Sequence, residues 1–135
     1  MRRSRLKAPT IMHELSICQA LVSQVLTLAQ ERAASSVRQV RIGVGPLSGV
    51  EWQLLQSAYP LACAGTRAEG SRLEIEHTEL RVRCRSCGID SVVAPNHLTC
   101  TACGDWRTAL ISGDELLLLS VELEIADQKE ELARV

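Results

Sequence analysis

The sequence predicts an α+β fold, in which a small three-stranded antiparallel sheet carries two helices on one face and a cysteine-rich lobe is inserted before the last strand. Helical and alternating apolar patterns follow one another as helix, strand, helix, strand, and a long alternating strand comes after the cysteines. The 135 residues suffice for one domain. We expect residues 12–80 and 112–126 to form its body, residues 81–111 the lobe, and residues 1–11 an N-terminal extension that is disordered or not native.

The first helix is expected from about His13 to Ala34, because apolar residues recur there at steps of three and four. Ser35 and Ser36 break this period. The strand that follows alternates, with Val40, Ile42 and Val44 on one face.

A second helix is expected after the breaker-rich turn Gly45–Gly49. Its apolar side is predicted to carry Val50, Leu54, Ala58 and Leu61. Pro60 should kink or shorten this helix, because proline lacks a backbone donor and clashes with the preceding turn.

The remaining strands flank the cysteines. One begins at Leu73 and runs toward Cys84, with a change of phase near Thr78 that favours a β-bulge. The last strand ends near Ile125, and its start is apolar on both faces, which places it centrally in the sheet. The charged tail from Asp127 should be frayed.

Two Cys-x-x-Cys pairs form the strongest motif. Cys84 and Cys87 are followed, after the twelve residues 88–99, by Cys100 and Cys103. The two-residue gap lets both sulfurs of a pair reach one ion, and four thiolates close a tetrahedral shell around Zn²⁺ that leaves no open catalytic position. The alternatives are disulfides or a redox pair, but a thioredoxin-like motif has a single Cys-x-x-Cys.

Composition argues against several functions. The 15 Lys and Arg balance 16 Asp and Glu, and the aromatic residues are two Trp and one Tyr, which disfavours nucleic-acid binding through phosphates or base stacking. No apolar run is long enough to span a membrane. The basic start lacks the apolar core of a signal peptide, and thiolates kept for metal fit a reducing compartment, so we expect a cytoplasmic protein.

Catalytic machinery is not evident, since there is no phosphate-binding glycine loop and no nucleophile–base pair. Among the remaining donors, His77 is expected to have a surface or packing role, and His97 to be solvated or to assist a second metal site in the lobe. Cys18 and Cys63 are expected to be small core residues.

His13 stands next to a methionine that could be a translation start. If the chain began at Met12, its α-amine, the His13 imidazole and the backbone amide nitrogen between them would lie within one chelate. Such a nitrogen set suits square-planar Ni²⁺ or Cu²⁺. The simpler interpretation is an accidental surface histidine, with Glu14 favouring the helix start through the helix dipole.

Several segments together resemble a known family. They are Met12–Ile17, Gly45–Glu51, Glu69–Ile75, the two cysteine pairs and Ile111–Leu116, in that order. This combination is similar to the hydrogenase nickel-incorporation protein family HypA/HybF, and the resemblance covers about Met12 to Ile125.

The resemblance implies a nickel metallochaperone and not an enzyme. It implies that His13 is the nickel ligand, that Glu14 is an accessory ligand or supports His13, and that the four cysteines hold a structural zinc ion. The implied partners are the GTPase HypB, the large subunit of [NiFe] hydrogenase and, for some members, urease maturation proteins; a weak homodimer is also possible.

Two features depart from the family pattern. Eleven residues precede Met12, so a free amine beside His13 requires Met12 to be the native start. Pro60 is unexpected in its helix and is interpreted as a local shortening. The competing functional hypothesis is a zinc-ribbon adaptor for protein interactions that transfers no nickel.

Overall fold

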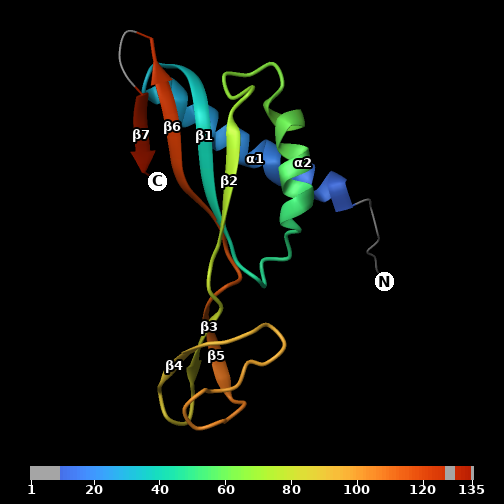
Figure 1. Cartoon of the computed structure of the whole chain (residues 1–135), viewed down its shortest axis with the longest axis vertical. Coiled ribbons are helices and arrows are strands. Elements are labelled where there is room, and N and C mark those ends of the chain that lie inside the picture. The colour runs from blue at the N-terminus through green and yellow to red at the C-terminus, as the bar shows by residue number, and fades with distance from the viewer. Residues whose placement is uncertain (1–9, 127–129, 135) are drawn as a thin grey trace. The chain divides into compact units, whose positions relative to one another are not determined.

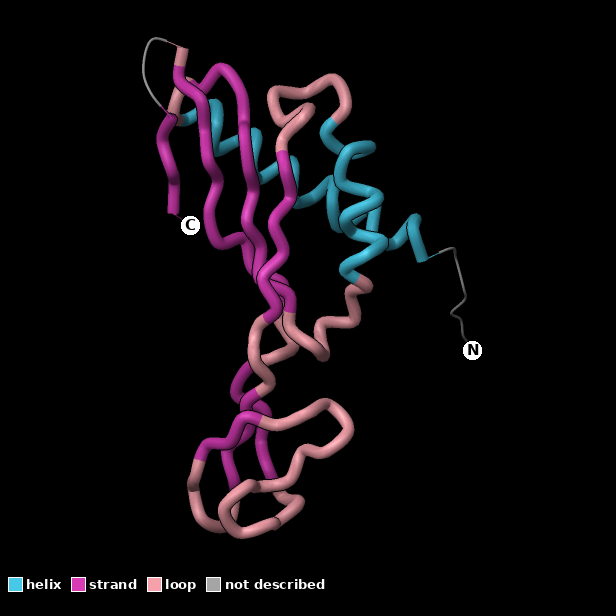
Figure 2. Tube along the Cα trace, viewed as in Figure 1, coloured by secondary structure: helices cyan, strands magenta, loops and turns pink. Residues whose placement is uncertain are grey.

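The computed structural model describes residues 10–126 and 130–134, and it confirms the α+β class (Figures 1 and 2). The helices are α1 (Thr10–Glu31) and α2 (Trp52–Cys63). The strands are β1 (Ala34–Val44), β2 (Arg72–His77), β3 (Arg81–Cys84), β4 (Asp90–Val92), β5 (Thr108–Ser112), β6 (Leu116–Ile125) and β7 (Glu130–Arg134). They form two sheets, with strand orders β2-β1-β6-β7 and β4-β3-β5.

The chain divides into two compact units. The first contains the chain up to Ile42, then Glu51–Ile75, and everything from Leu118 onward. The second contains Gly43–Val50 and Glu76–Leu117, and therefore all four cysteines of the paired motifs. Each candidate metal-binding segment thus lies within a single unit.

The larger sheet has one strand more than the sequence predicts. Strand β7 pairs antiparallel with β6, so part of the tail that was expected to fray is ordered. Residues 127–129 of that tail and residues 1–9 of the N-terminal extension lie outside the described residues. Strand β6 lies between β1 and β7, which confirms its predicted central position.

The ends of the first helix and the first strand also differ from expectation. Helix α1 stops at Glu31, because Ala33 adopts a positive φ of 54° that ends the helical path. Strand β1 then begins at once, six residues before Val40, and it contains Ser35 and Ser36, the two residues that break the helical period. Ser35 and Ser36 donate through their hydroxyl groups to the carbonyl and carboxylate oxygens of Glu124 in β6.

The core of the first unit lies where α1 and α2 pack together and where α1 passes behind the larger sheet (Figure 1). Helix α2 continues through Pro60 to Cys63, because Pro60 lies on its exposed face where water can solvate the freed carbonyl. Its buried face was predicted correctly only in part: Ala58 is buried as expected, but Leu61 is 64% exposed. The residues that α2 buries are Leu55, Ala58, Tyr59 and Cys63.

In the second unit, β3 is the central strand and pairs antiparallel with both β4 and β5. The sequence predicted one bulged strand from Leu73 to Cys84, whereas the structure contains two strands, β2 and β3, interrupted at residues 78–80. The register irregularity lies between Arg81 and Val82, against β5. Strand β3 ends at Cys84, so the sheet itself delivers the first ligand of the cysteine cluster.

Candidate metal centres

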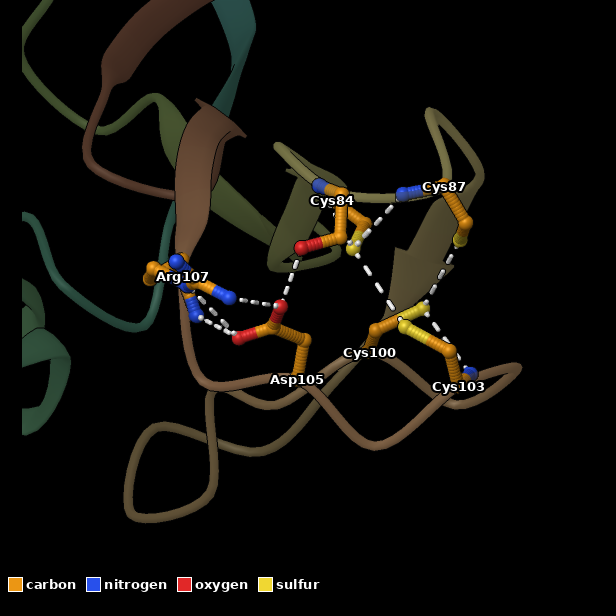
Figure 3. A network of polar contacts seen from close by, with 7 residues as sticks. Cys84, Cys87, Cys100, Cys103, Asp105 and Arg107 are labelled. Atoms are coloured by element: carbon orange, nitrogen blue, oxygen red, sulfur yellow. Dashed lines mark hydrogen bonds and ion pairs between the residues drawn. The ribbon is translucent and has the colours of Figure 1, made fainter.

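Four sulfur atoms converge at one end of the smaller sheet (Figure 3). The Sγ atoms of Cys84 and Cys103 are 3.6 Å apart, as are those of Cys87 and Cys100. All four lie within 4.8 Å of one another. A tetrahedral zinc ion with Zn–S bonds of about 2.3 Å requires sulfur–sulfur edges of about 3.8 Å, so the sulfur positions fit such an ion closely.

The two cysteine pairs are built in the same way. In the first pair, the amide groups of Ser86 and Cys87 donate to the Sγ of Cys84 at 3.3 and 3.4 Å. The corresponding amides of the second pair donate to the Sγ of Cys100 at the same distances. Each turn closes on a glycine: Gly88 has a φ of +77° and donates its N–H to the Cys84 carbonyl.

These amide contacts stabilise thiolates. The amide of Cys87 is the main cause that lowers the pKa of the Cys84 thiol. At the second pair, the amides of Cys103 and Ala102 lower the pKa of Cys100 to about 6. The first cysteine of each pair is therefore predisposed to the deprotonated form that binds metal.

A polar cluster supports the sulfurs from outside. Asp105 follows the second pair, and its carboxylate accepts from the Nε and Nη2 of Arg107 at 3.2 and 3.0 Å (Figure 3). The same carboxylate accepts from the Ser86 hydroxyl in the first turn. Arg107, with Ser86, holds the pKa of the Asp105 carboxyl well below its usual range. The sequence does not indicate this cluster, because Asp105 and Ser86 belong to different turns.

His13 and Glu14 lie side by side in helix α1 but in opposite environments. The His13 side chain is 61% exposed, whereas Glu14 is fully buried. The His13 Nδ1 lies 3.7 Å from Glu14 Oε1, which has no hydrogen-bond partner in the described part of the chain. His13 and Glu14 are not part of the four-sulfur cluster. Among the described residues, that cluster is the group of three or more His, Cys, Asp or Glu side chains close enough together to hold one metal ion.

Glu14 has a structural partner that the sequence did not suggest. Its Oε2 accepts the backbone N–H of Glu51 at 3.0 Å. Glu51 is the N-cap residue of α2, and its own side chain makes no capping hydrogen bond. Glu14 of α1 therefore caps α2, at the end where a helix dipole favours negative charge.

The other donors have the environments expected from sequence. Cys18 and Cys63 are fully buried, and the Cys18 thiol donates to the Leu55 carbonyl at 3.5 Å. Burial, together with Cys63 and Glu14 nearby, raises the pKa of Cys18 to about 12. His97 is exposed in the second unit, and its backbone N–H donates to the Ala94 carbonyl. Neither helix in residues 10–126 is long and apolar enough to cross a membrane.

Comparison with known proteins gives consistent matches over most of the chain. A family described as hydrogenase/urease nickel incorporation, metallochaperone, HypA matches residues 12–123. The hydrogenase maturation factor HypA of Nitrosospira multiformis is 53% identical over 112 residues, which cover 83% of this chain and 97% of that protein. The HypA of Aquifex aeolicus is 40% identical over 114 residues, which cover 84% of this chain and 99% of that protein.

Solved structures support the same architecture. The solution structure of the Ni metallochaperone HypA from Helicobacter pylori matches with a TM-score of 0.63 and 22% sequence identity, covering 84% of this chain and 98% of that one. At this level of identity, the likeness concerns the fold alone.

Proposed function

Because the chain belongs to the HypA family of hydrogenase and urease nickel-incorporation metallochaperones, we propose that it binds Ni²⁺ at the start of α1 and passes the ion on during the maturation of a nickel enzyme. One observation carries the position of the site. His13 Nδ1 and Glu14 Oε1 are 3.7 Å apart. Two donors on one first-row ion, each about 2 Å from it, lie at most about 4 Å apart, so this pair can share an ion.

His13 is the principal ligand in this proposal. Its imidazole is exposed and can be reached by a hydrated ion, and imidazole suits Ni²⁺ well. In a form that begins at Met12, the His13 amide would be among the first four N–H groups of helix α1, which have no acceptor within the helix. That amide nitrogen can join the chelate without breaking an intrahelical hydrogen bond.

Glu14 is the second group of the proposed nickel site. Its Oε2 is held by the Glu51 amide, which leaves Oε1 as the atom that faces His13. We assign Glu14 the role of an accessory group that attracts the cation and limits the movement of the imidazole. Because its Oε1 has no hydrogen-bond partner among the described residues, this oxygen can approach an ion without losing another contact.

We further propose that the nickel-binding form begins at Met12. The family match starts at this residue, and a free amine there adds a strong nitrogen donor beside His13. The intact mass of the protein purified from its native source tests this point. A mass that includes residues 2–11 would contradict it.

The four cysteines are proposed to hold a structural zinc ion, and they fit it in number, spacing and donor chemistry. The ion would supply a fixed tetrahedral junction between the two turns. Cys84 and Cys100, whose sulfurs accept hydrogen bonds from backbone amides, would be the ligands that lose their protons most readily. Cys87 and Cys103, whose pKa values are raised by desolvation and the neighbouring sulfurs, would lose their protons on binding the ion and close the exposed side of the site.

Delivery is proposed to involve the GTPase HypB and the large subunit of [NiFe] hydrogenase, and urease maturation proteins for a urease. A small donor set that includes one exposed imidazole favours release to a site with more ligands. Complementation tests this function: in a host lacking its own family member, the Met12 form should restore nickel-dependent hydrogenase activity and its His13→Ala variant should not. Equal activity of both variants would favour an adaptor role without nickel transfer.

A further inference from the structure

The two cysteine turns need a connection that does not depend on the metal. Each turn is closed by its own hydrogen bonds, from Gly88 N–H to the Cys84 carbonyl and from Gly104 N–H to the Cys100 carbonyl, both at 3.0 Å. These bonds shape each turn separately. They do not set the distance between the turns, and four thiolates brought together repel one another until an ion neutralises them.

Asp105 contacts both turns. Its carboxylate accepts from the Ser86 hydroxyl, which lies between Cys84 and Cys87 in the first turn. Its backbone carbonyl accepts from the Cys100 N–H, which opens the second turn, at 3.0 Å. The side chain is only 14% exposed, so water competes weakly for these contacts.

Arg107 anchors the same carboxylate to strand β5. It donates from Nε and Nη2 to the two carboxylate oxygens, and its backbone N–H donates to Asp105 Oδ1 at 2.9 Å. The Arg107 carbonyl in turn accepts the N–H of Arg85, again from the first turn, at 2.9 Å. Figure 3 shows the Asp105 carboxylate between the Arg107 side chain and the turn that follows Cys84.

We propose that Asp105 is a positioning residue of the metal centre: with Ser86 and Arg107 it forms a clamp that holds the two cysteine pairs at chelating distance before an ion is bound. Metal-binding free energy is spent partly on ordering the ligands, and a contact that orders them in advance leaves more of it for affinity. The inference rests on the proposed occupation of the four-cysteine site by zinc.

The direct test compares Asp105→Asn with a matched control, Asp90→Asn. Asp90 makes the same kind of paired contact, accepting from Arg83 Nε and Nη2 at 2.8 and 3.2 Å, but it joins β4 to β3 and touches neither turn. Zinc affinity is measured on the full chain by competition with a chromogenic chelator. We expect Asp105→Asn to weaken zinc binding by about 10–100-fold, and Asp90→Asn to change it by less than about twofold.

Two further measurements separate positioning from a general loss of structure. Saturating Co²⁺ should give the same four-thiolate absorption spectrum in Asp105→Asn as in the parent, while chelator-induced release becomes faster. Ser86→Ala, which removes one arm of the clamp, should shift affinity in the same direction by a smaller factor.

The outcomes are distinct. A parent chain that binds no zinc would overturn the proposed zinc site and this inference with it. A parent that binds zinc, with Asp105→Asn and Asp90→Asn equal in affinity, would overturn the clamp alone. A changed Co²⁺ spectrum in Asp105→Asn would also overturn it, because the residue would then be needed for ligation itself.

Discussion

Replacing Glu14 should destabilise the first unit through helix α2, although Glu14 lies in α1. The fully buried carboxylate accepts the Glu51 N–H at 3.0 Å and is the cap that α2 uses in place of an N-cap side chain. Glu14→Ala leaves this amide without its acceptor and removes one of the two acidic side chains, with that of Glu51, near the N-terminus of α2.

The size of the effect follows from the contact. Loss of an N-terminal cap lowers the free energy of unfolding by about 1–2 kcal/mol. The hydrogen bond from the Glu51 N–H is only partly buried, so water can reach the unpaired amide and limit this loss. For a unit of this size, about 1–2 kcal/mol lowers the melting temperature by about 5–15 °C. Glu14→Gln keeps an oxygen that can accept from Glu51 and should lose less than about 1 kcal/mol.

Thermal unfolding followed by circular dichroism at the helical wavelength measures this, because α1 and α2 both belong to the first unit. His13→Ala is the matched control: its side chain is 61% exposed, so it should change stability by less than about 0.5 kcal/mol. If Glu14→Ala melts with the parent, or if His13→Ala loses as much stability as Glu14→Ala, the capping role is wrong.

Three further predictions concern packing and protonation. A Cβ at Gly45 would overlap a backbone carbonyl, so Gly45→Ala should accelerate hydrogen exchange across the second unit. Gly49 faces open space, so Gly49→Ala should disturb only its own turn. Equal rates of hydrogen exchange in the two variants would contradict this. Leu55→Ala should lower the free energy of unfolding in urea by about 2–5 kcal/mol, and Leu61→Ala should lower it by less than about 0.5 kcal/mol. A larger loss in Leu61→Ala would mean that α2 buries the face that carries Leu61, as the sequence predicted. Backbone amides lower the folded-state pKa of Cys100 to about 6, so the contribution of its thiolate is complete above the ordinary thiol pKa and is lost as the pH falls through about 6. Zinc release to an indicator dye should therefore increase as the pH falls through about 6, and release that does not change between about pH 8 and pH 5 would contradict this.

The sequence was most informative where structure is local. The two-residue spacing within each cysteine pair requires a tight turn, and the glycine after each pair permits it, so the convergence of the four sulfurs could be predicted without tertiary information. The central position of β6 could also be predicted from local sequence, because Leu116 and Leu118 make the start of the strand apolar on both faces.

What the sequence could not provide depends on contacts between distant segments. Glu14 and Glu51 are 37 positions apart, and only the packing of α1 against α2 makes one the cap of the other. Ser35 and Ser36 were predicted only to break the helical period, and their place in β1 depends on hydrogen bonds to Glu124 of the distant strand β6. The Asp105 contact with Ser86 likewise joins two turns 19 residues apart.

Nickel binding at His13 is tested most directly by a calorimetric Ni²⁺ titration of the zinc-loaded protein that begins at Met12, of its His13→Ala variant and of the full 135-residue chain. We expect one-to-one binding in the Met12 form, loss of that binding in His13→Ala, and weaker binding in the full chain, which has no free amine beside His13. Equal nickel binding by all three proteins would contradict the assignment of His13 and of the start of α1 as the nickel site.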